Sequence, residues 1–81
     1  MNVRVQLFAG ARQAAGRGLI ELQLAEEATI GELRRRLAAE IPPMAGLLQR
    51  SMFAIDAEFV DDRQEIPAGA DVACIPPVSG G

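Results

Sequence analysis

The chain closes on the stretch Asp71-Val72-Ala73-Cys74-Ile75-Pro76-Pro77-Val78-Ser79-Gly80-Gly81, in which an apolar strand pattern runs directly into a proline and glycine tail. Val72 and Cys74 fall on one face of an alternating pattern, so residues 71–75 predict a strand. Two prolines end it, because each fixes φ at about −65° and lacks a backbone donor. We therefore divide the chain into a folded domain, residues 1–75, and an extended C-terminal tail, residues 76–81.

The start of the chain predicts a matching strand. Residues 2–8 alternate between apolar and polar positions, with Val3, Val5 and Leu7 on one face. Both the first and the last strand are strongly apolar, so we expect them to pair at the centre of one sheet. Three further strands are predicted over residues 19–24, 52–55 and 58–60, the last two joined by a tight turn at Asp56-Ala57.

One long helix is predicted between the second and third strands. Thr29 and Glu32 form a capping box, which opens a helix that runs to about Glu40 before Pro42-Pro43. Its apolar stripe is expected at helical spacing, at Ile30, Leu33, Leu37 and Ile41. The arginine run 34–36 is expected to lie on a solvated face, with docking to an acidic partner as the alternative.

This order of elements predicts an α+β fold. One main helix against one mixed sheet, with the first and last strands central, is the β-grasp (ubiquitin-like) arrangement. A short helical segment is expected over residues 9–16, and another over residues 44–50, packed through Leu47 or Leu48. Residues 61–69 are expected to be irregular, with Ile66 turned inward.

Composition excludes several classes of function. The 81 residues carry a net charge of −3, which does not favour nucleic acid as a partner, and every positive side chain is Arg. With one Cys and no His, a Cys/His metal site is excluded, so no metal is expected. The single Cys fits a reducing compartment. No apolar run reaches membrane-spanning length and no signal peptide is visible, so we expect no membrane association and a cytoplasmic location.

The side chains offer no catalytic set, which directs attention to the tail. Without His no catalytic triad is possible, and Cys74 is expected to be a buried small hydrophobe, with a reactive thiol as the alternative. Gly80 and Gly81 present a thin profile that a partner enzyme can enclose, and residues 76–81 can reach about 20 Å when extended. The carboxylate of Gly81 is therefore the candidate reactive group, and an inert, frayed end is the alternative.

The tail resembles that of a known family, the small, sulfur-carrying subunits of molybdopterin synthase. The Pro-Pro-Val-Ser-Gly-Gly ending carries most of the likeness, and the opening strand with Ala11-Arg12 and the helix start at residues 29–33 extend it. Two positions depart from the family pattern. Asp56 stands where Asn is frequent, and Ala70 stands where an acidic residue is frequent, so the geometry of these two turns is in doubt.

The resemblance implies a sulfur-donating subunit that is not itself catalytic. A ubiquitin-activating-type adenylyltransferase would use ATP to adenylate Gly81, and a persulfide enzyme would supply sulfur to form a C-terminal thiocarboxylate. The large synthase subunit, in an expected heterotetramer, would carry the catalytic residues and build the pyranopterin dithiolene of the molybdenum cofactor. The chain itself would bind no cofactor. Partner contacts are expected at Gly80, Ser79, Val78, Pro77, Pro76, Ile75 and Phe8.

Several alternatives stay open from the sequence. Phe8 and Ile75 have packing within the domain as their alternative role. For the whole chain, the rival functions are sulfur transfer in thiamine, cysteine or transfer-RNA thiolation pathways, a ubiquitin-like protein modifier, and an interaction module whose tail is never modified.

Overall fold

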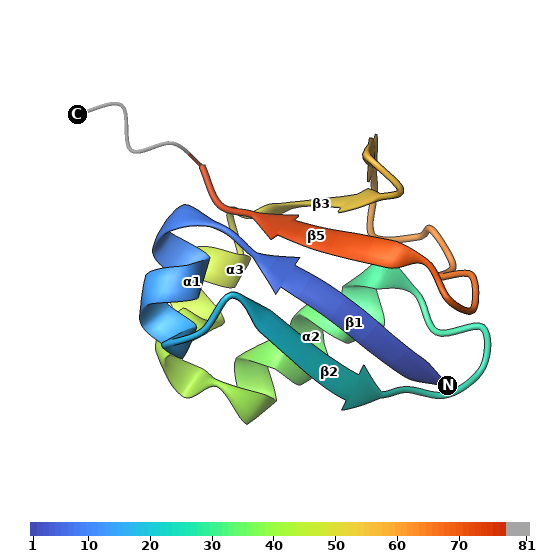
Figure 1. The fold of residues 1–81 in the computed structure, drawn as a ribbon, viewed down its shortest axis with the longest axis horizontal. Helices are drawn as coiled ribbons and strands as arrows, with labels where there is room; N and C mark the ends of the chain where they lie inside the picture. Colours follow the sequence, from blue (N-terminus) through green and yellow to red (C-terminus); the bar gives the residue numbers. More distant parts are fainter. Residues whose placement is uncertain (78–81) are drawn as a thin grey trace.

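A computed structural model describes residues 1–77 and shows a five-stranded sheet in the order β2-β1-β5-β3-β4 (Figure 1). The central pair, β1 (Asn2–Leu7) and β5 (Asp71–Ile75), is parallel, whereas all other neighbours are antiparallel. The outer strands are β2 (Leu19–Gln23), β3 (Met52–Ile55) and β4 (Glu58–Val60). The prediction of a β-grasp fold with the first and last strands at the sheet centre is confirmed.

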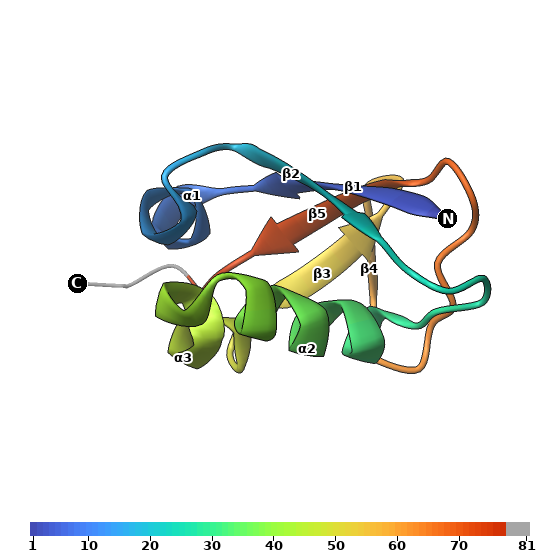
Figure 2. The ribbon, with the colours of Figure 1, turned by 90° about the horizontal axis from the view of Figure 1, so that it is seen from below.

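The helices leave one face of the sheet open. The long helix α2 (Ile30–Glu40) crosses the other face, followed by the short segments η1 (Pro42–Met44) and α3 (Ala45–Leu48) (Figure 2). The helix α1 (Ala9–Ala15) follows β1 at the end of the sheet and closes on Gly16, whose φ is +76°. None of the helices in residues 1–77 is long and apolar enough to cross a membrane.

The core lies between α2 and the sheet. Val3, Val5 and Leu7 of β1 are buried, as their alternation predicts, and Ile66 is also buried. Three of the four expected α2 positions, Ile30, Leu33 and Leu37, are fully buried. Ile41 is only half-buried, because it is the residue at which the helix ends and its backbone no longer has helical geometry.

The N-terminus of α2 is fixed by its cap and by the loop that follows β4. The hydroxyl oxygen of Thr29 accepts a hydrogen bond from the Glu32 N–H at 3.3 Å, which confirms the predicted cap. The Gly31 N–H donates to the Asp62 carbonyl at 3.0 Å. A Cβ at Gly31 would lie 3.2 Å from the same carbonyl oxygen, which is tighter than an ordinary contact, so the close approach of helix and loop favours glycine there.

The prediction of a solvated arginine face is wrong for Arg34. Its guanidinium pairs with Asp62 at 2.7 Å, donates to the carbonyl oxygens of Ser51 and Leu48, and lies 4.9 Å from the centre of the Phe53 ring. The reason is that the segments after α3 and β4 fold over this side of α2. These contacts tie the helix to the start of β3.

The β3–β4 hairpin turns where the sequence predicts, at Asp56-Ala57. Both residues have positive φ, +49° and +70°, which is the requirement of a two-residue turn that follows the twist of the strands. The Asp56 side chain also accepts a hydrogen bond from the Asp71 N–H at 3.1 Å, so the turn is held against the start of β5.

Replacing Gly31 by Ala is expected to lower the free energy of unfolding by about 1–3 kcal/mol, because the new methyl group must displace the Asp62 backbone. The matched control is Gly46→Ala, where a Cβ meets nothing within 4 Å in the described residues. That change should be neutral or stabilise the helix by up to about 1 kcal/mol. Urea unfolding of both variants measures the difference, and equal effects would contradict the close approach.

Candidate functional site

The strand that leads into the tail is held on both sides. Phe53 of β3 and Leu7 of β1 both pair with Cys74, and the Phe8 N–H donates to the Cys74 carbonyl at 3.3 Å. Pro76, two residues after Cys74, is buried, whereas Pro77 is exposed. The exposed part of the described tail therefore begins at Pro77. The expected site residues Val78, Ser79, Gly80 and Gly81 lie outside the described residues.

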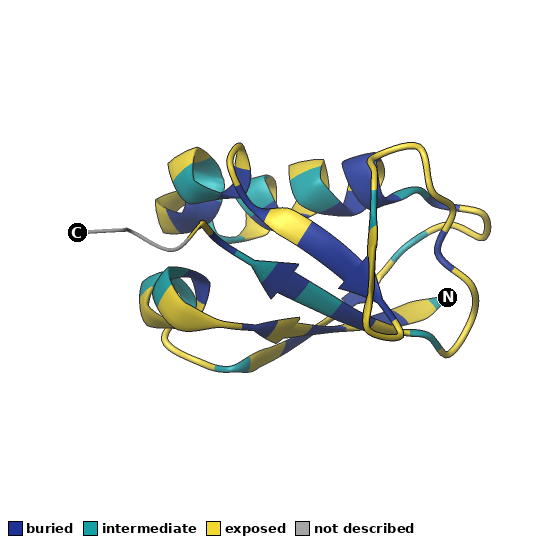
Figure 3. Ribbon diagram, turned by 90° about the horizontal axis from the view of Figure 1, so that it is seen from above, coloured by how far each residue is buried: buried dark blue, intermediate teal, exposed yellow. Residues whose placement is uncertain are grey.

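The open sheet face carries the large apolar side chains that the domain leaves exposed. A row of paired positions crosses all five strands on this face, from Leu19 through Gln6, Ala73 and Ala54 to Phe59. Leu19 is 39% exposed and Phe59 is 62% exposed, and Met52, beside Ala54 on the same face, is 53% exposed. Figure 3 shows how β3, buried at three of its four residues, and β5, where buried and half-buried residues alternate after Asp71, give way to the exposed edge at β4.

Two hollows flank the point where β5 ends. The first, which we call the sheet-face groove, has a volume of about 390 Å³ and is lined by Ala54, Ala73 and Phe59 among others. The second, the end groove, has a volume of about 430 Å³ and is lined by Gly10, Leu47 and Pro77 among others. Phe8 and Ile75 line both grooves.

Phe8 is therefore exposed on a ridge between the two grooves. Its side chain is 45% exposed, so packing within the domain does not account for it, whereas Ile75 is half-buried and serves both the fold and the surface. The Phe8 carbonyl accepts hydrogen bonds from the N–H groups of Ala11 and Arg12, and Ala9 adopts a left-handed φ of +47°. The backbone of Phe8 is thus held on both sides, which reduces the entropy lost when its ring is covered by a partner.

Met52, Phe59 and Leu19 are surface residues that the sequence did not single out. The strand β3 reads Met-Phe-Ala-Ile, which is apolar at every position and gives no alternation from which to decide the exposed face. The pairing of Met52 with Ile75 places it beside the tail exit.

Cys74 is confirmed as a buried residue. Its side chain is fully buried and forms no disulfide, and burial raises the pKa of its thiol above the ordinary value despite the opposing effects of the Ser51 hydrogen bond and the Arg34 charge. Within residues 1–77 no group of three or more His, Cys, Asp or Glu side chains could hold a metal ion. The described side chains thus leave the tail as the candidate reactive element.

A β-grasp domain with a central last strand, an apolar open face and an exposed Pro77 just after that strand defines a ubiquitin-like protein. Residues 5–81 match the ThiS family, and the chain belongs to this family. A molybdopterin synthase sulfur carrier subunit from Chlamydomonas reinhardtii is 31% identical over 83 residues, which cover 100% of both chains.

Two solved structures share the fold. SAMP1 from Haloferax volcanii has a TM-score of 0.87 and 22% identity, and covers 100% of both chains. One protein of the complex of subunits 1 and 2 of the molybdopterin-converting factor from Helicobacter pylori has a TM-score of 0.71 and 21% identity, also over 100% of both chains. At these identities the two structures establish the architecture alone.

Cys74 is expected to resist alkylation by iodoacetamide in the native protein, because the buried thiol is neither accessible nor readily ionised. Alkylation at pH 8 should proceed only at the rate of unfolding and become complete in denaturant, as measured by intact mass. Rapid alkylation of the folded protein would show that Cys74 is a reactive thiol.

Proposed function

We propose that this chain is the sulfur-carrier subunit of a molybdopterin synthase, and that its reactive group is the C-terminal carboxyl group of Gly81. The observation that supports this most directly is the family match, which runs through to residue 81 and thus includes the Gly-Gly ending. The relative from Chlamydomonas, matched over its full length, carries that function in its name.

The proposed chemistry begins with activation by another protein. An adenylyltransferase joins the Gly81 carboxylate to the AMP portion of ATP and releases pyrophosphate, which converts an unreactive anion into an electrophile. The terminal sulfur of a protein persulfide then attacks the acyl carbon and displaces AMP. A second thiol cleaves the resulting acyl persulfide, so that a disulfide forms and the thiocarboxylate remains on Gly81.

The folded domain supports this role by delivering the tail. β5 is anchored between β1 and β3, so the tail leaves from a fixed point beside Phe8 and Ile75. We propose that the open face and this ridge dock the large synthase subunit, which then draws the tail beyond Pro76 into its active site and transfers sulfur to a pyranopterin precursor. The Helicobacter complex of two subunits is the architectural precedent.

The decisive experiment incubates the purified chain with an adenylyltransferase and a persulfide donor from the same genome, together with ATP. Intact mass should show one oxygen replaced by sulfur, located at Gly81 by fragmentation. A variant without Gly81 should keep the wild-type melting curve and gain no sulfur, because the reacting carbonyl is displaced from the activating site.

Other outcomes would identify other functions. Gly81 in isopeptide linkage to lysines of other proteins would indicate a protein modifier. An unchanged terminus after the full incubation would contradict sulfur carriage. A thiocarboxylated chain that supplies sulfur to a thiamine precursor but not to a pyranopterin would keep the chemistry and reassign the pathway.

Replacing Phe8 by Ala is expected to weaken binding of the large subunit by about 10-fold to 100-fold, because an exposed aromatic side chain on a fixed backbone is a typical anchor. Isothermal titration calorimetry measures the change. The matched control is Arg63→Ala, on an exposed loop, where the dissociation constant should change less than about twofold. Equal dissociation constants for the wild type and Phe8→Ala would show that the large subunit docks on another surface.

A further inference from the structure

The charges of this chain are sorted by position. Three segments, residues 8–18, 41–53 and 72–77, contain Arg12, Arg17 and Arg50 and not one Asp or Glu. The rest of the sequence carries the other five Arg and all eleven acidic residues. A chain with net charge −3 thus has a locally positive part.

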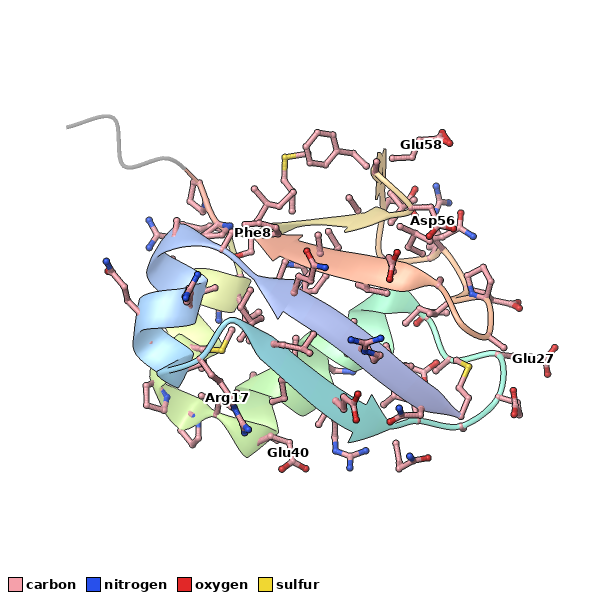
Figure 4. The ribbon with its side chains drawn as sticks, in the orientation of Figure 1. Phe8, Arg17, Glu27, Glu40, Asp56 and Glu58 are labelled. Carbon is pink, nitrogen blue, oxygen red and sulfur yellow. The ribbon has the colours of Figure 1, made fainter. Side chains whose placement is uncertain are left out.

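The three segments meet at one end of the molecule, which we call the tail end. The Phe8 N–H donates to the Cys74 carbonyl, and Met52 pairs with Ile75, so the first and second segments both adjoin the end of β5. The end groove is lined by all three segments. Figure 1 shows α1 and α3 beside the end of β5, and Figure 4 places Arg17 and Glu40 toward this side and Glu27, Asp56 and Glu58 at the opposite end.

The three arginines are also available for a partner. All three are exposed, and none takes part in the ion pairs found among residues 1–77. The acidic residue at the C-terminal end of α2, Glu40, is paired with Arg36 at 2.9 Å. The three segments that form the tail end contain no acidic side chain, so the charges of their arginines are not neutralised within these segments.

A purely structural role accounts for only one of the three. Arg12 lies in the last turn of α1, where a cation stabilises the helix, and its side chain lies along Gly18. Arg17 and Arg50 lie outside helices and have no such role. Three charges are also a small electrostatic footprint for nucleic acid, whose binders neutralise many phosphates.

We propose that Arg12, Arg17 and Arg50 form an arginine collar, which steers the tail onto proteins whose tail-receiving opening is rimmed by Asp and Glu side chains. The inference rests on the proposed function, since it concerns the partners that grasp the tail. An acidic rim is attracted by the collar and repelled by the acidic opposite end, so the encounter is oriented with the tail leading. A carboxylate and a thiocarboxylate carry the same charge, so the collar acts before and after sulfur is loaded.

The test compares two triple variants with equal net charge. One removes the collar, by Arg12→Gln, Arg17→Gln and Arg50→Gln, and the other makes the same change in net charge at exposed positions off the open face, by Arg35→Gln, Arg63→Gln and Gln64→Glu. Stopped-flow association with the large subunit and with the adenylyltransferase from the same genome is measured at several salt concentrations. Melting curves verify that each variant is folded.

The collar variant should associate about tenfold more slowly than the wild type at low salt, with its dissociation rate changed less than about twofold. The difference should vanish at about 0.5–1 M salt, where charges are screened over a few ångströms. The control variant should stay within about twofold of the wild type.

The remaining outcomes are distinct. Equal slowing of both triple variants, or no slowing in either, would overturn the collar and leave the proposed function standing. A wild-type chain that binds neither protein would overturn both. Salt-dependent binding of ATP or of a single-stranded DNA oligomer at the collar, tighter than binding of the two proteins, would overturn the acidic protein rim as its target.

Discussion

The parallel pairing of β1 with β5 is the constraint on which the rest of this small domain depends. Two strands whose paired residues lie 67 positions apart, beginning with Arg4 and Asp71, form the centre of the sheet, and every other element is arranged around them. A parallel pair cannot be closed by a tight turn, so the helix, the hairpin and the irregular loop must all lie between its members. The pairing also brings the last strand to the middle of the fold, where neighbours hold it on both sides.

That placement separates stability from reactivity. Burial of Cys74 and Val72 on the inner face of β5 stabilises the domain, while the same strand continues into Pro76 and Pro77, which pair with no strand. The domain can therefore be rigid up to Pro76 and still offer its end to another protein. In the proposed function, the chemistry that needs a nucleotide, a persulfide and acid–base groups belongs to partner proteins.

Local patterns were sufficient to predict most of the fold. The alternation of β1, the Thr29 cap and the Asp56-Ala57 turn each depend on residues a few positions apart, and each is observed. The contacts of Arg34 join residues 14 to 28 positions apart, and no periodicity reveals them. The exposure of Met52 could not be predicted either, because its strand is apolar at every position and shows no alternation. For the site, the sequence singled out Phe8, and the reactive tail stays a prediction from the sequence. The end groove depends on the packing of α1 against α3, which no local pattern reveals.

The ridge formed by Phe8 and Ile75 borders both grooves, and this has a consequence for the order of events. A protein that covers this ridge blocks it for any other protein, so the chain can bind only one such partner at a time. In the proposed function, a loaded carrier would have to leave the protein that loaded it before it could bind the next partner. Its end group would therefore have to survive in solvent between the two encounters. The relative affinities of the partners for the carrier, rather than a permanent complex, would then set the order of binding.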